Sequence, residues 1–465
     1  MPATHVVVLA AGKGTRMKSR LPKVLHQAAG LPLIEYVLRN AESLEPTTIV
    51  VVVGYGAADV ERTVVPRPGL RFARQEPQLG TGHALLQAEP ALEGQSGTVV
   101  LLSGDVPLLR AGTLRRLIDH HQAHRAAATV VTAVVDDPSG YGRIVREGGK
   151  IAAIVEHRDA SSDERAVREI NSGIYAFDAA PLFEALRDIG SSNAQGEYYL
   201  PDLVRIYRRR AMPVETVVLE DSMEISGVNS RKELAAVAAA LRQARNDELM
   251  ASGVTLVDPS TTYVGPDVRI GADTIVHPGV HLEGRTEIGE NVVIHSGVRI
   301  VDSRIESGAV INNFCVITES RVGPGARLGP FAHIRPASDV GPDAHVGNFV
   351  ELKKTSLGRG SKANHLTYLG DATVGEKVNV GAGTITCNYD GVAKHPTVIE
   401  DGAFIGSDSQ LVAPVRVGRG AYVAAGSSIT EDVPAESLAI ARGKQVNKEG
   451  WVARKKNKAA LPRSE

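Results

Sequence analysis

The stretch "IGADTIVHPGVHLEGRTEIGENVVIHSGVRI", residues 270–300, carries an aliphatic residue at every sixth position. The series starts at Val264 and continues, with one-residue slips and less regular passages, to Ile429. A period of six matches neither an α-helix nor an alternating strand. It is typical of a coil with three flat sides, in which each hexapeptide supplies one side and one inward-pointing aliphatic side chain. Stacked coils of this kind bury a continuous apolar column.

The glycine content agrees with such a coil, because the chain has 47 Gly and only 4% aromatic residues. Gly often follows the aliphatic residue directly, as at Ile270-Gly271 and Val417-Gly418. We expect Gly and Asn at the corners of the coil, where the backbone needs positive φ. About two dozen positions fit the period, which is too many for chance.

The first 229 residues follow a different pattern, in which apolar runs typical of strands alternate with stretches typical of helices. The strands are expected at residues 5–9, 48–53, 98–102 and 129–135, and helices at 33–43 and 80–88. This alternation predicts a mainly parallel α/β sheet with ligands at the carboxyl ends of its strands.

A helix is expected between the two patterns. Ser230 and Glu233 form a capping box, and Gly253 would end the helix about 22 residues later, after roughly 33 Å. Its apolar face would hold Leu234, Val237, Ala238, Leu241 and Leu249. The predicted parts are an α/β domain at 1–229, a linker helix at 230–252, a β-helix at 253–447 and a basic, frayed tail at 448–465.

Charge and cysteine content restrict the class of protein. Lys and Arg number 52 against 53 Asp and Glu, which argues against binding to nucleic acid or to a membrane surface. Cys315 and Cys387 have no spacing typical of zinc or of a disulfide framework. With no basic leader and no apolar stretch of membrane-spanning length, we expect a soluble cytoplasmic protein.

A glycine-rich basic loop follows the first predicted strand. Gly12-Lys13-Gly14 matches neither the Walker loop nor the dinucleotide fingerprint, so taken alone it is a weak sign of phosphate binding. Asp105 follows another buried run and is either a ligand of a hard cation or a helix N-cap.

Further motifs accompany this loop: QLGTGHA (78–84), GYGRIV (140–145), IVEHRDA (154–160), EINSGIY (169–175) and GVNSR (227–231). Together they resemble the nucleotidyltransferases that activate sugar 1-phosphates. Among these, nearly the whole chain resembles the bifunctional UDP-N-acetylglucosamine pyrophosphorylase and glucosamine-1-phosphate N-acetyltransferase family. The resemblance implies a Rossmann-like nucleotidyltransferase domain, a long linker helix and a left-handed parallel β-helix of hexapeptide repeats, α/β overall.

The resemblance also implies the site of the N-terminal half, where UTP and N-acetylglucosamine 1-phosphate would react with magnesium as cofactor. Arg16 and Lys23 would meet the triphosphate, and Asp105 and Asn229 would hold the metal. The nucleotide sugar would be bound by Leu9, Ala10, Ala11, Gly12, Lys23, Gln75, Gly80, Thr81, Gly142, Glu156, Asn171 and Asn229. A sugar 1-phosphate is already an anionic nucleophile, so the attack needs charge neutralisation rather than a general base.

Two polar breaks in the period, at residues 357–373 and 386–396, argue against a merely structural β-helix, because breaks in a solenoid are loops and loops carry sites. An amine needs a base to attack acetyl-CoA, and imidazole, which His365 carries in the first break, is a suitable type of group. The resemblance assigns that role to His365. It implies that glucosamine 1-phosphate is bound by Arg335, Lys353, Tyr368, Asn379 and Lys394, and acetyl-CoA by Ala382, Asn388, Tyr389, Ser407, Ala425 and Arg442.

The leading hypothesis is therefore a two-step enzyme that acetylates glucosamine 1-phosphate and then uridylylates the product, a precursor for peptidoglycan and lipopolysaccharide-type envelopes. The resemblance implies a homotrimer packed through the β-helix. The main alternative is a single-activity nucleotidyltransferase with a structural β-helix; a non-catalytic assembly protein is a third. A γ-type carbonic anhydrase is a further alternative, but it leaves the N-terminal half unexplained.

Overall fold

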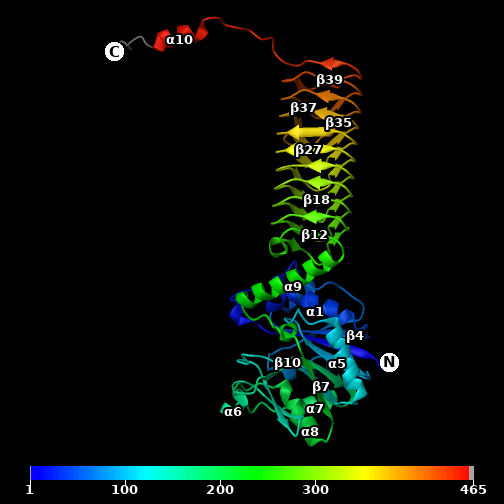
Figure 1. The fold of residues 1–465 in the computed structure, drawn as a ribbon, viewed down its shortest axis with the longest axis vertical. Coiled ribbons are helices and arrows are strands. Elements are labelled where there is room, and N and C mark those ends of the chain that lie inside the picture. Colours follow the sequence, from blue (N-terminus) through cyan, green and yellow to red (C-terminus); the bar gives the residue numbers. More distant parts are fainter. Residues whose placement is uncertain (1, 460–465) are drawn as a thin grey trace. The chain divides into compact units, whose positions relative to one another are not determined.

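The structure, a computed structural model, describes residues 2–459. Contacts divide the chain into two compact units, one ending at Arg245 and the other starting at Asn246 (Figure 1). The division falls inside helix α9 (Arg231–Ala251). Among the described residues, no helix is both long enough and apolar enough to cross a membrane.

The first unit is built on a mixed sheet with strand order β11-β7-β10-β6-β1-β4-β5, to which β8 and β9 add a hairpin beside β10. Only β10 runs antiparallel to its neighbours in this order, so the expectation of a mainly parallel sheet is confirmed. The strands are β1 (Thr4–Ala10), β4 (Thr48–Val53), β5 (Leu70–Arg74), β6 (Thr98–Ser103), β7 (Ala128–Val134), β8 (Arg143–Glu147), β9 (Lys150–Val155), β10 (Glu169–Asp178) and β11 (Val214–Leu219); β2 (Gln27–Ala28) and β3 (Leu31–Pro32) pair separately.

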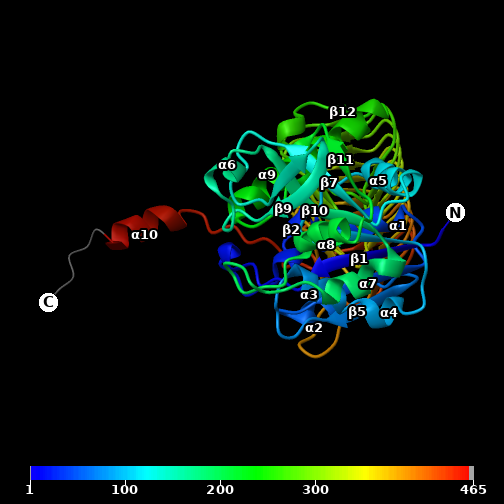
Figure 2. The ribbon, with the colours of Figure 1, turned by 90° about the horizontal axis from the view of Figure 1, so that it is seen from below.

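Helices cover both faces of this sheet (Figure 2). Val6 and Val8 of β1 pack in one core with α1 and α5, and Val7 packs in the opposite core with α3, α7 and α8. Strand β4 is buried along its whole length, as expected for a strand covered on both sides. The helices are α1 (Leu33–Glu42), α2 (Ala57–Thr63), α3 (Thr81–Leu86), α4 (Glu89–Leu92), α5 (Ala111–Ala123), α6 (Ser162–Arg165), α7 (Ala179–Arg187) and α8 (Leu203–Arg209).

Helix α9 starts with the predicted capping box. The Ser230 amide donates to Glu233 Oε2 at 2.8 Å, and the Glu233 amide donates to Ser230 Oγ at 3.3 Å. Val237 packs in a cluster of the first unit, whereas Leu249 belongs to the core of the second unit. The predicted apolar face is thus divided between two cores.

The second unit is a parallel β-helix whose strands form three sheets. The first holds β12 (Thr255–Leu256), β15 (Ile275–Val276), β18 (Val293–Ile294), β21 (Val310–Ile311), β24 (Arg327–Leu328), β27 (His345–Asn348), β30 (Lys362–His365), β33 (Asn379–Val380), β36 (Phe404–Ile405), β39 (Tyr422–Val423) and β41 (Leu438–Ala439). The second holds β13 (Tyr263–Val264), β16 (His281–Glu283), β19 (Arg299–Val301), β22 (Val316–Thr318), β25 (His333–Ile334), β28 (Glu351–Lys353), β31 (Tyr368–Gly370), β34 (Ile385–Cys387), β37 (Gln410–Val412) and β40 (Ser428–Ile429). The third holds β14 (Arg269–Ile270), β17 (Glu287–Ile288), β20 (Arg304–Ile305), β23 (Arg321–Val322), β26 (Asp339–Val340), β29 (Ser356–Leu357), β32 (Ala372–Val374), β35 (Thr397–Ile399) and β38 (Val415–Val417).

Strand pairing explains the period and its slips. Ile275 pairs with Val293 eighteen residues later, which is one turn of three hexapeptides. Val293 pairs with Val310 only seventeen residues later, so a slip is one residue omitted within a turn. Asn379 pairs with Phe404 twenty-five residues later, because this turn contains an additional loop. The inward aliphatic residues form one buried column.

The expectation of Gly and Asn at the corners is wrong for part of the coil. Gly279 and Gly297 have positive φ as expected, but the positions above them hold Phe314, Phe331 and Phe349, with φ of 59°, 56° and 55°. Left-handed backbone costs a bulky residue about 1–2 kcal/mol. These side chains are about half exposed.

The C-terminal tail also differs from the expectation of a frayed end. It forms helix α10 (Trp451–Ala459), whose side chains are exposed where they are described. The rest of the predicted tail, residues 460–465, lies outside the described residues.

Two isoleucines on neighbouring turns test the inward column. Ile294 is fully buried, whereas Ile275 points outward and is 37% exposed. Ile294→Ala is expected to lower the free energy of unfolding by about 2–5 kcal/mol, because it leaves a cavity. Ile275→Ala, the matched control, is expected to lower the free energy of unfolding by clearly less. Equal losses in urea denaturation would contradict the predicted orientation of the column.

Candidate active sites

The basic loop of the first unit is shaped around Pro22 and Lys23. Gly14 has φ +61°, and a Cβ there would lie 2.7 Å from the Cβ of Lys23. A Cβ at Gly56 would lie 2.5 Å from Cγ of Pro22. The two glycines therefore leave room for the chain that carries Lys23 towards the end of the sheet.

Lys23 contacts both predicted metal ligands. Its Nζ forms an ion pair with Asp105 Oδ2 and donates to Asn229 Oδ1 at 3.2 Å. Asp105 is not a helix N-cap, because α5 begins at Ala111 with Arg110 as its cap. The sequence alternative of a capping role for Asp105 is therefore wrong.

Backbone hydrogen bonds fix the two ligands relative to each other. The Val228 amide donates to the Asp105 carbonyl at 3.0 Å, which ties the two loops together. The Asn229 amide donates to Glu233 Oε2 at 2.6 Å, so the first turn of α9 holds Asn229 in place. The sequence analysis did not identify this contact of Glu233, although the capping box contains the residue.

A cavity of about 220 Å³ brings together a large part of the predicted nucleotide-sugar site. Five predicted residues line it: Leu9, Thr81, Gly142, Glu156 and Asn171. A neighbouring cavity of about 510 Å³ shares Glu156 and is lined by Arg16. Residues that lie far apart in the sequence of the first unit thus meet at the ends of the central strands.

Local hydrogen bonds position the remaining predicted residues of this unit. Gln75 Nε2 donates to the Gly80 carbonyl at 2.9 Å, and Gln78 Nε2 donates to the Ala11 carbonyl at 3.2 Å. Gly12 follows Ala10 and Ala11 after β1, and a Cβ there would meet no atom within 4 Å. The loop backbone is therefore open at Gly12.

The Asn171 side chain is fixed by a residue that the sequence analysis missed. Tyr175 is buried, and its hydroxyl donates to Asn171 Oδ1 at 2.9 Å. The register of β10 against β7 shifts between these two residues. The motif EINSGIY contains both residues, but their contact depends on the bulge between them, which the sequence does not reveal.

The surroundings of Glu156 in this site disfavour its ionised form. Burial raises its pKa above the ordinary value of 4.5, and the nearby Asp159 and Asp202 raise it further. A carboxylate that lines a cavity and is costly to ionise is typical of a functional pocket rather than of a structural core.

In the second unit, Asn348 selects the tautomer of His365. The ring nitrogen Nδ1 lies 2.8 Å from Asn348 Oδ1. Because this oxygen can only accept, Nδ1 carries a proton, and in the neutral ring Nε2 is left with a free lone pair. Asn348 lies seventeen residues before His365, one turn of the coil, and the sequence analysis missed it.

Four of the five residues predicted to bind the sugar phosphate gather beside one sheet. Arg335 Nη1 donates to Glu351 Oε1 at 2.8 Å, and Glu351 pairs with Tyr368 in the next turn. The nearby ammonium of Lys394 lowers the pKa of Lys353, and Arg335 lowers it further. Such crowded cations suit a phosphate.

Asn379 is not brought to this group within one chain. It lies on β33, which belongs to a different sheet from the strands that carry Lys353 and Tyr368. It pairs there with Lys362 and Phe404.

Four of the six residues predicted to bind acetyl-CoA form a column along successive turns. The Asp408 amide donates to the Ala382 carbonyl, and the Gly426 amide donates to that of Ser407. Arg442 Nη1 donates to the Ala425 carbonyl at 2.7 Å. The column therefore starts one turn after His365.

The additional loop holds Asn388 and Tyr389 beside the sugar-phosphate group. Asn388 Nδ2 donates to Asp371 Oδ2 at 2.6 Å, while Tyr389 is 60% exposed. A Cβ at Gly370 would lie 2.4 Å from the Tyr368 hydroxyl and 2.8 Å from Asn388 Nδ2. Gly370 therefore lets these two side chains come together.

Comparison with known proteins identifies both units. The MobA-like NTP transferase domain family matches residues 6–173, and the bacterial transferase hexapeptide family matches residues 267–302 and 396–431. The "Bifunctional protein GlmU" of Shouchella clausii is 50% identical over 97% of this chain and 99% of its own length. That of Pelobacter propionicus is 51% identical over 98% of this chain and 100% of its own length. The chain belongs to the GlmU family.

Membership of the GlmU family confirms the resemblance inferred from the motifs, and with it the combination of a nucleotidyltransferase unit and a left-handed β-helix of hexapeptide repeats. The relatives match both units and α9, so the likeness is not confined to one of them. Among residues 2–459, no three His, Cys, Asp or Glu side chains form a group that could hold a metal. A metal site in this GlmU-family chain would need water or substrate oxygens besides Asp105 and Asn229.

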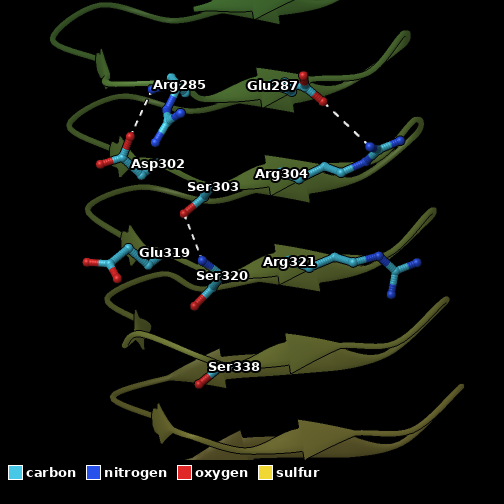
Figure 3. A pocket seen from close by; sticks show the side chains of 9 residues that line it. All are labelled: Arg285, Glu287, Asp302, Ser303, Arg304, Glu319, Ser320, Arg321 and Ser338. Atoms are coloured by element: carbon cyan, nitrogen blue, oxygen red, sulfur yellow. Dashed lines mark hydrogen bonds and ion pairs between the residues drawn. The ribbon is translucent and has the colours of Figure 1, made fainter. Parts of the chain in front are cut away.

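One groove of the GlmU-family β-helix carries none of the predicted residues (Figure 3). It measures about 410 Å³, and its charged side chains contact each other, as in the pair of Glu287 and Arg304 at 3.5 Å. The Ser320 amide donates to Ser303 Oγ at 3.1 Å, one rung of a ladder between turns. These contacts are structural.

The free-energy cost of ionising Glu156 in the folded state can be measured. A raised pKa means that the folded state holds the proton more tightly than the unfolded state, so stability falls as the pH rises above about 4.5. Glu156→Gln is expected to raise the melting temperature at about pH 7, and less so at about pH 4.5. Glu93→Gln, at an exposed position, is the control. A lower melting temperature for Glu156→Gln at pH 7 would show that the carboxylate is stabilising.

Proposed function

We propose that the chain catalyses two reactions of UDP-N-acetylglucosamine synthesis. Residues 253–447 would transfer acetyl from acetyl-CoA to glucosamine 1-phosphate. Residues 1–229 would transfer uridylyl from UTP to the N-acetylglucosamine 1-phosphate so formed, with release of pyrophosphate. The linker helix 230–252 joins the two, and the product would serve peptidoglycan and lipopolysaccharide-type envelopes.

The uridylyl site is supported by the arrangement of Lys23, Asp105 and Asn229 at the end of the central sheet. A carboxylate and an amide oxygen are ligands suited to a hard divalent cation, and the ammonium between them indicates that a cation is accepted there. We propose magnesium, which would neutralise charge on the phosphates. Arg16 would act on the same phosphates from the neighbouring cavity.

The acetyl site is supported by the pair of His365 and Asn348, the single observation that carries this half of the proposal. Asn348 leaves Nε2 of His365 free to take the proton from the attacking amine. Arg335, Lys353 and Lys394 would hold the phosphate of the acceptor, and the column from Ala382 to Ala425 would hold the acetyl donor. Direct attack of the amine requires no acyl-enzyme on Cys387.

Two alanine variants of the full chain separate the reactions. His365→Ala is expected to lower acetyl transfer by about 10²–10⁴-fold, the usual contribution of a general base, and to leave uridylyl transfer unchanged. Asp105→Ala is expected to abolish uridylyl transfer alone. His281→Ala, at an exposed histidine of the same β-helix, is the control for both assays. Loss of both activities in each folded variant would contradict two independent sites.

We also propose a homotrimer, with the β-helices in contact along the aromatic corner column, defined as Phe314, Phe331 and Phe349. Their rings stack at 5.2 and 5.3 Å between centroids and are about half exposed. Phe349 directly follows Asn348, and Leu366, 63% exposed, directly follows His365. Burial of this surface by another copy would offset the cost of its left-handed backbone and would lie beside the catalytic histidine.

A charge in the aromatic corner column tests the assembly. Phe331→Glu is expected to convert trimers to monomers in analytical ultracentrifugation and to reduce acetyl transfer, while uridylyl transfer persists. Val65→Glu places the same charge at an exposed position of the first unit and should leave the trimer intact. A trimer that survives Phe331→Glu would exclude this column from the interface.

A further inference from the structure

Lys23 occupies the oxygens that the metal would use. Its Nζ contacts Asp105 Oδ2 and Asn229 Oδ1, one oxygen from each proposed ligand. Both carrier loops are fixed by the Val228 and Asn229 amides. The two oxygens therefore form one cation position, filled by the ammonium of the chain itself.

An ammonium and a divalent ion cannot share this position. Magnesium binds oxygen at about 2.0–2.1 Å, so an ion bound to both oxygens would lie immediately beside Nζ. Two positive charges a few ångströms apart repel strongly in a site shielded from water. The side chains of Lys23 and Asp105 are only 16% and 14% exposed, so solvent screens this repulsion poorly.

The Lys23 side chain can leave without disturbing the fold. Its stem runs over Gly14, where no Cβ obstructs it, and four methylene groups separate Nζ from the backbone. The phosphate-binding role inferred for Lys23 also needs the ammonium away from Asp105, because a paired lysine has less charge to offer an anion.

We propose that Lys23 is a placeholder cation: it neutralises Asp105 while the metal position is empty, and it moves to the triphosphate when a divalent ion takes that position. This rests on the proposed function, which assigns Asp105 and Asn229 to a metal. Without a nucleotide the displaced ammonium has no anion to contact, so the divalent ion competes poorly. With the triphosphate present, both cations have oxygen partners, and the metal and nucleotide bind cooperatively.

The test is a titration of the full chain with Mn²⁺ alone, without nucleotide, followed by electron paramagnetic resonance of the free ion. Lys23→Met keeps the stem and removes the charge, and we expect it to bind Mn²⁺ about 5- to 150-fold more tightly than the unaltered chain. Lys13→Met removes the same charge from the same loop, where Lys13 Nζ lies 5.6 Å from the Tyr55 ring centroid. This control should leave Mn²⁺ affinity within about twofold of that of the unaltered chain.

A third variant separates the two proposals. Asp105→Asn, alone and combined with Lys23→Met, should remove the Mn²⁺ site. If Mn²⁺ binding is the same with and without Asp105, the metal assignment of the proposed function is wrong. If binding needs Asp105 but Lys23→Met gives no gain, or no more than Lys13→Met, only the placeholder proposal is overturned.

Folding is checked by circular dichroism of every variant. Should Lys23→Met not fold, Lys23→Gln decides, because it removes the charge and keeps a polar group in its place. We then expect a gain in Mn²⁺ affinity in the same direction. No gain in folded Lys23→Gln would overturn the placeholder role.

Discussion

A single buried aliphatic column is the constraint on which the second unit depends. Each turn of three short sides points its aliphatic side chains into this column and contacts only the turns above and below. Other side chains, such as those of Ile275 and Tyr389, lie outside the column. The candidate catalytic groups can therefore lie on the outside without altering the core.

The first unit differs from the second, because its sheet is buried on both faces and only the ends of the strands are accessible. The candidate residues accordingly come from many segments, and charges near them are paired before any substrate arrives. Lys23 with Asp105 and Arg335 with Glu351 are examples, one in each unit. A phosphate or a metal that bound at these groups would have to exchange partners with them rather than fill an uncharged space.

The sequence predicts the architecture well, because both periods report directly on burial. Four strands of the first unit (β1, β4, β6 and β7), the capping box of α9 and the coil were predictable from spacing, whereas β5, β8, β9, β10 and β11 were not among the expected strands. The motifs pointed to His365, Asp105 and Asn229 as candidate residues. They did not predict Asn348, which lies beside His365 only because one turn is seventeen residues long. They did not predict the contact of Tyr175 with Asn171 either, because it depends on a bulge. The aromatic corner column was not predictable either, because Gly and Asn are the residues expected at positive φ, and Phe is not.

The additional loop between Asn379 and Phe404 shows that a corner of the coil tolerates an insertion. These residues stay in parallel register although twenty-five residues separate them, so a corner can lengthen while the stack above and below continues undisturbed. A corner is therefore a place where a scaffold can gain chemistry by insertion, with the cost confined to closure of one loop. Grafting loops of other lengths at this corner offers a route to acceptors of different size, on a core that needs no redesign.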